Sequence, residues 1–364
     1  MKFIAGLSFL ASLAAAASVD VNKRDTPLDV KLELLGNTGV KASITNTGAS
    51  ALKLFKVGTL LDEQPVEKVE VHAADRQVTF DGIRYQISTQ GLTDEAFRSI
   101  AAGETIEVEF DAAETHDLSE GGAVELLSQG AFSYADADST TIAGVVPFTS
   151  NVVSTSVDGA AAKAVHESFH EKVKRTIVQS SCTGSQGTAT RNAISACRSL
   201  ASRAQTAASS GSASKFQEYF KTTSASTRST VAAVFGRIVS ECGSTTSGVS
   251  RYYCNDVLGA CSSGVLAYTQ PATSVMVNCP LFFSALSPTS STCHDQDQQT
   301  TILHEMTHLT QIKGTSDYNG YGYNFVRSLS AAQNLNHADT YTLYAQGELD
   351  DPSLFLLVCE NFLC

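Results

Sequence analysis

Two short stretches of the chain contain the same pattern, in which a histidine and a glutamate are followed by a second histidine. They are HESFH at residues 166–170 and HEMTH at residues 304–308. Histidines four residues apart lie on one face of a helix, where both can bind one zinc ion while the glutamate acts as general base. Such a site also needs a third protein ligand. One catalytic domain needs only one site of this kind, so the remaining sequence has to decide between the two stretches.

The N-terminus has the pattern of a secretory signal. Lys2 precedes an apolar run that closes on small alanines, and the run is too short to span a bilayer. We therefore expect a signal peptide at residues 1–17 and a secreted, extracellular protein. No later stretch of the sequence is long and apolar enough for a membrane helix, so we expect no membrane partner.

The cysteines divide the rest of the chain into two parts. All nine lie in its second half, and the first of them is Cys182. In an oxidising compartment this distribution predicts a disulfide-bonded domain behind a cysteine-free region with a different role. The dibasic pair Lys174-Arg175 lies just before Cys182. We therefore predict a propeptide at residues 18–175, which a dibasic-cutting processing protease removes, and a mature catalytic domain at residues 176–364.

This division places HESFH in the propeptide and HEMTH in the mature domain. In one interpretation HESFH is a solvated helical linker whose spacing is incidental. In the other, His166 or His170 fills the open ligand position of the active-site metal in the uncut chain. We expect the propeptide to act as an inhibitor or as a folding aid.

The charge of the chain excludes one class of function. The formal net charge is −12, and residues 176–364 contain 10 Lys and Arg against 12 Asp and Glu, so most of the negative charge lies in the predicted propeptide. Neither part has a basic patch suited to nucleic acid. A mildly acidic mature surface favours basic protein and peptide substrates weakly, through electrostatic steering.

We expect the protein to be a monomer.

The first part of the chain has the hydrophobic period of strands. LDVKLEL from Leu28 and IEVEF from Ile106 alternate apolar and polar residues, which is typical of half-buried strands. Residues 25 to about 150 are therefore expected to form a small antiparallel sandwich.

The predicted mature domain has the period of helices instead. Apolar residues recur at helical spacing over residues 194–204 and 231–239. Two strand-like passages follow, VLAYT at residues 265–269 and SVMVN at residues 274–278, and an edge of one of them could bind extended substrate as a further strand. The predicted fold class is α+β, with a mainly helical catalytic domain and a small β-sheet, preceded by a β-rich prosegment.

A further helix is predicted to carry HEMTH. We expect Asp295 or Asp297 to cap its N-terminus and Gly314 to end it. His304 and His308 then project from one face, about one turn apart. The apolar side of this helix contains Ile302, Leu303, Met306 and Leu309.

The third ligand decides the class of zinc site. The glycine and the third histidine of the metzincin motif are missing after His308. A glutamate ligand would be Glu348, and an aspartate ligand would be Asp317 or Asp339. Spacing alone leaves these candidates open.

The sequences HEMTH, GTSDYNGYG and NHADTYTLYA together resemble the deuterolysins, secreted fungal zinc endopeptidases of the aspzincin group. The resemblance spans the whole predicted mature part, including SKFQEYFKTT, YYCND and CHDQDQ, and extends to the order of signal, long prosegment and dibasic cut. It implies a zincin-like catalytic domain that binds one Zn²⁺. It also implies an inactive preproprotein that hydrolyses peptide bonds after processing.

Carried onto this sequence, the resemblance implies that His304, His308 and Asp317 bind the zinc. Glu305 would then be the general base, and Tyr321 would donate a hydrogen bond to the oxyanion. The family usually places two residues between the aspartate and the Tyr-Gly pair, whereas this chain has three.

That insertion leaves Tyr318 as a competitor of Tyr321 for the oxyanion. Asp339 would hold a ligand histidine or line the pocket for the residue after the scissile bond. Thr342 stands where the related peptidyl-Lys endopeptidases have a glutamate, so strict lysine specificity is not expected.

The same resemblance implies two disulfides. Cys197 and Cys242 are predicted to form an additional pair that joins two helices, and Cys293 has two candidate partners near the C-terminus. The pairs implied by the family are Cys182–Cys254 and Cys261–Cys279, and the candidate partners are Cys359 and Cys364.

An alternative function from another class is a secreted, non-catalytic zinc-binding or toxin-like module rich in disulfides. Such a module would bind zinc through the same side chains. Replacement of Glu305 would not affect it, whereas it would abolish proteolysis by an enzyme.

Overall fold

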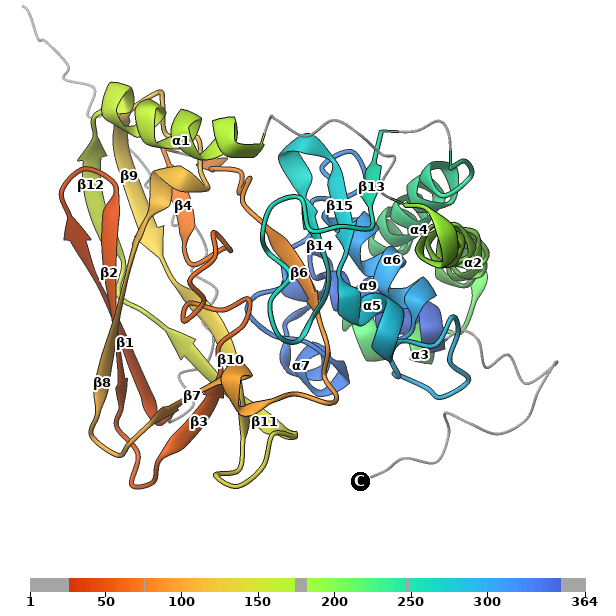
Figure 1. The fold of residues 1–364 in the computed structure, drawn as a ribbon, viewed down its shortest axis with the longest axis horizontal. Coiled ribbons are helices and arrows are strands. Elements are labelled where there is room, and N and C mark those ends of the chain that lie inside the picture. The colour runs from red at the N-terminus through yellow and green to blue at the C-terminus, as the bar shows by residue number, and fades with distance from the viewer. Residues whose placement is uncertain (1–25, 75, 174–181, 246–248, 348–364) are drawn as a thin grey trace, which may run out of the picture.

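The computed structural model describes residues 26–74, 76–173, 182–245 and 249–347. It has two regions side by side (Figure 1), an N-terminal region of residues 26–173 and a C-terminal region of residues 182–347. No helix within the described ranges is long and apolar enough to cross a membrane. Outside the described residues lie the predicted signal peptide, Lys174-Arg175, Glu348, Cys359 and Cys364.

The N-terminal region is built from antiparallel strands, as the alternating sequence predicts. In β1 (Leu28–Leu35) the apolar residues of the alternation are buried, and β2 (Gly39–Asn46) pairs with both β1 and β8 (Thr105–Asp111). Two further sheets have the strand orders β11-β10-β3-β7 and β12-β9-β4-β5. Their strands are β3 (Leu52–Phe55), β4 (Glu70–Ala73), β5 (Arg76–Gln77), β7 (Phe97–Ile100), β9 (Gly122–Leu127), β10 (Gln129–Ala135), β11 (Ile142–Thr149) and β12 (Val153–Val157).

The sheets of the N-terminal region enclose their own apolar core, which includes Val40, Ile44 and Phe132. The helix α1 (Gly159–Val173) follows β12 and carries HESFH. It lies across one end of the strands (Figure 1) and packs on the 3-10 turn Ala112–Glu114.

The C-terminal region combines helices with one small sheet. The long α2 (Gly184–Ser210) packs against α4 (Ala225–Glu241), and the apolar residues at helical spacing in both are mostly buried, as predicted. Both predicted strand passages are strands, β14 (Val265–Gln270) and β15 (Val275–Asn278). The remaining elements besides the motif helix are α3 (Ala213–Phe220), β13 (Arg251–Tyr253), α5 (Pro280–Ala285), α7 (Tyr323–Ser328), α8 (Ala331–Asn334) and α9 (Ala338–Gly347).

The helix that carries HEMTH is α6 (Gln298–His308), and every residue of it is buried. Asp297 caps it, accepting from the Thr300 backbone amide at 2.8 Å, so of the two predicted caps Asp297 is correct and Asp295 is wrong. The prediction that Gly314 ends the helix is also wrong. The chain leaves the helix at Leu309 because the following turn folds back, where the Thr315 amide donates to the Thr307 carbonyl.

One sheet contains strands from both regions. Its strand order is β13-β15-β14-β6, and β6 (Arg84–Ile87) comes from the N-terminal region. β6 crosses to the C-terminal region and lies antiparallel beside β14 (Figure 1). The predicted substrate edge at residues 265–269 is therefore covered by another part of the same chain.

The cysteines follow the sequence predictions in part. Cys293 is disulfide-bonded, although both of its predicted partners lie outside the described residues. Cys197 and Cys242 face each other at the predicted helix contact, but they are thiols with their sulfur atoms 3.4 Å apart. A disulfide needs about 2.05 Å, so the prediction of an additional disulfide is wrong in this structure. The two family pairs are present as Cys182–Cys254 and Cys261–Cys279.

Candidate metal centre

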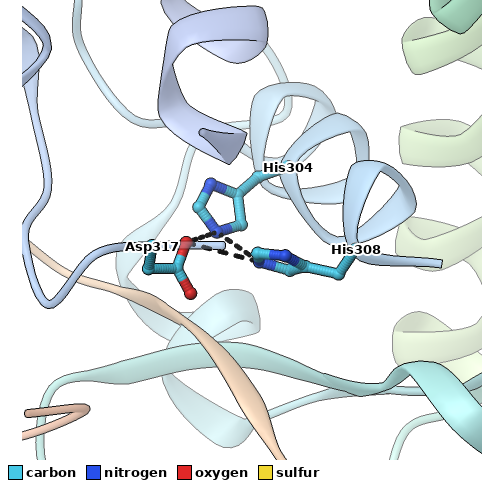
Figure 2. A group of neighbouring side chains, drawn as sticks. All are labelled: His304, His308 and Asp317. Carbon is cyan, nitrogen blue, oxygen red and sulfur yellow. Dashed lines mark hydrogen bonds and ion pairs between the residues drawn. The ribbon is translucent and has the colours of Figure 1, made fainter. Parts of the chain in front are cut away.

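Three donor atoms converge beside α6 (Figure 2). His304 Nε2 and His308 Nε2 are 3.0 Å apart, and Asp317 Oδ1 lies 3.4 Å and 3.5 Å from them. Ligand atoms about 2.0–2.2 Å from a tetrahedral zinc lie roughly 3.3–3.6 Å from one another. Apart from a slightly short distance between the histidines, the triangle has the size of one face of a zinc tetrahedron. Within the described residues, His304, His308 and Asp317 are the one group that could hold a metal.

The outer nitrogens of both histidines are held by acceptors. His304 Nδ1 donates to Asp339 Oδ1 at 2.8 Å, and His308 Nδ1 donates to the Thr315 carbonyl at 3.0 Å. Asp339 also accepts from the Gly322 amide at 2.6 Å, which fixes its carboxylate. In the neutral tautomer that these acceptors favour, with the proton on Nδ1, both Nε2 atoms would present lone pairs to the centre of the triangle, as a bound cation requires. Asp339 therefore lies behind His304, on the side of the ring away from Asp317.

The third corner of the triangle lacks a partner of its own. Asp317 Oδ1 is buried, and none of the described residues donates a hydrogen bond of normal geometry to it. A buried carboxylate oxygen without a donor is costly unless a cation binds it. The set of two imidazoles and one carboxylate is one that zinc prefers. The residues present thus fit a zinc ion.

Burial and charge together set the protonation of the three ligands. Burial opposes a charge on His304, but the approach of Asp317 and the hydrogen bond to Asp339 outweigh it and raise the pKa of His304 to about 10. Burial lowers the pKa of His308 to about 3. Burial opposes ionisation of Asp317 as well, yet the adjacent histidines lower the pKa of Asp317 below its usual range. The carboxylates of Asp317 and Asp339 therefore favour positive charge at this position, and a divalent cation would supply it.

Glu305 follows His304 in the chain, and its carboxyl group is buried beside the triangle. Its side chain is 1% exposed, and neither carboxylate oxygen receives a hydrogen bond of normal geometry from the described residues. Burial raises the pKa of Glu305 to about 8, while His304, the Thr269 hydroxyl and the Gln86 backbone amide favour its ionised form. A buried carboxyl that changes protonation near neutral pH is suited to taking up and releasing a proton.

The two candidate tyrosines have different surroundings. The ring of Tyr321 stacks beside His304, with centroids 6.2 Å apart, and burial and the charge of Asp317 raise the pKa of Tyr321 well above its usual value. Its hydroxyl therefore stays protonated and able to donate. The ring of Tyr318 stacks beside His337 instead, and its hydroxyl accepts from Asn336 Nδ2 at 3.4 Å.

The described side chains of HESFH are not part of this centre. His166 Nε2 lies 2.7 Å from Asp81 Oδ2, a partner within the N-terminal region, and the exposed Glu167 lies 3.8 Å from Lys163 on the same helix. The hypothesis that His166 contacts the active-site metal is therefore wrong for this structure. The side chain of His170 lies outside the described part of the chain.

Sequence reasoning missed the residues that the N-terminal region brings to the centre. Arg84 Nη1 pairs with Glu67 Oε2 at 2.7 Å, and Ser316, next to Asp317, donates to the same carboxylate oxygen at 2.8 Å. The alternation of Ile83, Tyr85 and Ile87 with polar residues was a signal for a strand. It carried no information that the strand pairs with β14, about 180 residues later in the chain.

The chain is similar to several known proteins. The Deuterolysin metalloprotease (M35) family matches residues 1–352. A neutral protease 2 homolog of Colletotrichum graminicola is 67% identical over 347 residues, 95% of this chain and 98% of that protein. Another, of Phaeosphaeria nodorum, is 63% identical over 350 residues, again 95% of this chain and 98% of that protein. A solved zinc peptidase from Grifola frondosa matches with a TM-score of 0.40 and 20% identity, covering 46% of this chain and 99% of that one. The family match favours an enzyme over a non-catalytic module.

Proposed function

The chain belongs to the deuterolysin metalloprotease family and is a metalloendopeptidase, and from this premise we propose how it binds zinc, cuts peptides and is kept inactive. His304, His308 and Asp317 bind one Zn²⁺ in the catalytic domain. Glu305 is the general base and Tyr321 the oxyanion donor. The observation that carries this assignment is the triangle of donor atoms with sides of 3.0, 3.4 and 3.5 Å, beside a buried carboxyl without hydrogen bonds.

The protein residues divide the work of hydrolysis. When bound, zinc would polarise the substrate carbonyl and lower the pKa of a water molecule toward neutrality. Glu305 accepts the proton of the attacking water and then passes it to the leaving amine, a role that suits its pKa of about 8. Tyr321 donates a hydrogen bond to the carbonyl oxygen as negative charge develops there. Asp339 and the Thr315 carbonyl keep the two imidazole rings oriented.

The precursor is proposed to have three parts. They are a signal peptide at residues 1–17, a propeptide at residues 18–175 that is removed after Lys174-Arg175, and a zincin-like catalytic domain at residues 176–364. Two observations support this division. The N-terminal region has its own apolar core, and the three metal ligands and Glu305 all come from the C-terminal region. We further propose that the mature enzyme is an extracellular monomer that favours basic proteins weakly.

Analysis of the secreted protein tests the proposal. We expect an N-terminus at Thr176, one zinc per chain, and hydrolysis of casein or protamine that a chelator abolishes and added zinc restores. An N-terminus before His166 would contradict the proposed division. Full proteolysis by protein that contains no metal would contradict the proposed mechanism.

A further inference from the structure

The strand β6 lies where an extended peptide would bind to the C-terminal region. It pairs antiparallel with β14, with Tyr85 opposite Tyr268 and Gln86 opposite Ala267. On its other side β14 pairs with β15, so β6 takes the second edge of β14 (Figure 1). Addition of an extended segment to a free strand edge is a general mode of peptide recognition, in which backbone hydrogen bonds supply affinity.

The peptide bond between Tyr85 and Gln86 lies at the metal centre. The Tyr85 carbonyl oxygen is 3.2 Å from His304 Nε2, one of the three donor atoms of the triangle. The backbone N–H of the next residue, Gln86, lies near enough to the Glu305 carboxylate to favour its ionised form, although it forms no hydrogen bond of normal geometry with it. A peptide about to be hydrolysed must present its carbonyl oxygen to the metal ligands and its nitrogen to the general acid-base group. This peptide bond presents its two polar groups in that way.

The segment after β6 is bound through its backbone. Gln296 Nε2 donates to the Ile87 carbonyl at 2.7 Å, and Gln296 Oε1 accepts from the Thr89 amide at 2.8 Å. The Ser88 amide donates to the Gly264 carbonyl at 2.7 Å. In these three contacts the bound segment uses only backbone atoms, which a peptide of any sequence in the same place could supply. Its one further contact with Gln296 uses a side chain, since the Thr89 hydroxyl also donates to Gln296 Oε1 at 3.1 Å.

Side chains of the N-terminal region keep β6 in this position. Tyr85 and Ile87 are buried in an apolar cluster to which both regions contribute, including Phe97 from one side and Val265 from the other. Arg84 is held by Glu67, which also accepts from Ser316 of the C-terminal region. The first residue of β6, Arg84, and its last residue, Ile87, are thus both held in place. Between them lies the position that a substrate would occupy.

We propose that residues Arg84–Ile87 occupy the substrate groove in the direction of a substrate, with Tyr85–Gln86 at the place of the cleaved bond, and thereby keep the uncut chain inactive. In the same arrangement Gln296 is the side chain that binds the substrate backbone on the leaving-amine side. The inference rests on the proposed function and adds to it the inhibitory element, the direction of the substrate and one positioning residue.

The first test compares two replacements of Gln86 in an uncut chain that carries Lys174→Ala and Arg175→Ala. Both Gln86→Pro and Gln86→Ala remove the side chain, but only proline removes the backbone N–H. We expect Gln86→Pro to raise hydrolysis of a short peptide by about 10- to 100-fold, because a proline inside a paired strand removes a backbone donor and disrupts the pairing of β6 with β14. We expect Gln86→Ala to raise it by no more than about threefold, since its backbone contacts remain.

A second readout does not depend on activity. Hydrogen exchange of the metal-free uncut chain reports directly on pairing between β14 and β6. Amides of Val265–Gln270 should exchange at least about 10-fold faster in Gln86→Pro than in Gln86→Ala. Equal protection and equal latency in the two variants would overturn the proposal.

A third pair of variants covers the case in which Gln86→Pro does not fold. Glu67→Gln weakens the ion pair that holds Arg84, whereas Glu120→Gln weakens the exposed pair with Arg76, at 2.8 Å elsewhere in the N-terminal region. Glu67→Gln should raise the peptidase activity of the uncut chain several-fold and Glu120→Gln should not. Equal activities would contradict the role of β6.

The role of Gln296 is tested in the processed enzyme with substrates of two lengths. Gln296→Met should raise KM about 3- to 10-fold for a peptide that extends four residues beyond the cleaved bond, because it removes neutral hydrogen bonds to the backbone. KM for a peptide that ends one residue beyond that bond, and kcat for both, should not change. Equal changes for both lengths would overturn this assignment. If the processed enzyme itself neither bound zinc nor cut peptides, the proposed function would fail, while the exchange experiment would still decide where β6 binds.

Discussion

The chain contains the same five-residue pattern on two helices, and within the described residues only the pattern on α6 belongs to a group that could hold a metal. On α1, His166 pairs with Asp81 and Glu167 is exposed. On α6, the two histidines and the glutamate are at most 1% exposed. The imidazole rings of α6 are oriented by Asp339 and by a backbone carbonyl, and Asp317 completes the triangle. The pattern places two imidazoles on one face of a helix, and the surrounding residues decide whether they become ligands.

The two helices also differ in how much their motif costs the stability of the fold. In the described part of α1, His166 is paired with Asp81 and Glu167 is exposed, so these two groups of the motif cost the fold little. In α6 the oxygens of Glu305 and one oxygen of Asp317 are buried without donors among the described residues. Such groups destabilise the fold by about 1–3 kcal/mol each unless a partner binds. The fold thus maintains at α6 a position whose polar groups a cation and a substrate can satisfy.

The largest expected difference between the motifs is catalytic. Glu305→Gln should lower kcat/KM at least about 1,000-fold, since it removes the general base, while zinc content stays near one per chain. The matched change Glu167→Gln, made in the uncut chain that retains this residue, should leave the residual peptidase activity and the zinc content of that chain unchanged. Peptidase kinetics and metal analysis of the processed enzyme and the uncut chain provide the measurement. Loss of activity in Glu167→Gln would return HESFH to the catalytic machinery.

The next difference concerns the carboxylates. Asp317→Ala should lose zinc and activity together, because it removes a ligand. Asp339→Ala should weaken zinc affinity or activity about 10- to 100-fold, the usual effect of removing a group that orients a ligand histidine. Asp81→Ala, the matched change beside HESFH, should leave zinc affinity unchanged. Titration with a competing chelator measures all three. Full zinc occupancy in Asp317→Ala with an empty site in Asp339→Ala would exchange the two roles.

The effect of zinc removal on thermal stability should depend on the histidines of α6 and not on those of α1. Zinc at 100 times its Kd stabilises the chain by about 2.7 kcal/mol if it binds only the folded state. We therefore expect zinc to raise Tm in the wild-type chain and in His166→Gln, and not in His308→Gln. Thermal unfolding with and without zinc is the measurement. A shift that persists in His308→Gln but disappears in His166→Gln would reverse the comparison.

The smallest expected effect comes from a histidine outside both motifs. Burial and the neighbouring Lys215 lower the pKa of His294 to about 4, and its Nε2 accepts from the Tyr219 hydroxyl. Because an unfolded histidine titrates near about 6.5, this stability is complete above that pH and is lost as the pH falls toward 4. The loss is on the order of 1 kcal/mol, since the ring is partly solvated. Denaturant unfolding at pH 7 and 4.5 should show a smaller loss in His294→Gln, and an equal loss would contradict this account.

Local features of the fold were predictable from the sequence. The alternation in β1 and the helical spacing in α2 and α4 identified elements whose buried faces the structure contains. The helix of HEMTH and its Asp297 cap also followed from nearby residues. In each case the responsible interactions join residues a few positions apart, which is the range over which sequence patterns report.

Features that depend on distant residues were not predictable from local patterns. Spacing alone left Asp317 and Asp339 both open as the third ligand, and it is the fold that places one at a corner of the triangle and the other behind His304. Cys197 and Cys242 meet as predicted, but their sulfur atoms are 3.4 Å apart. The place of β6 depends on a pairing with β14, about 180 residues later in the chain, for which no local pattern exists.

The position of β14 also has a consequence for solubility. A strand edge without a partner is a template for strands of other molecules and hence for aggregation. In the intact chain β14 lies between β15 and β6, so β6 of the same chain covers the edge of β14 that faces away from β15. Removal of that cover leaves an edge of only six residues, Val265–Gln270, and short edges limit pairing between copies. The capacity to accept an extended peptide and the tendency to self-associate therefore depend on the same six residues.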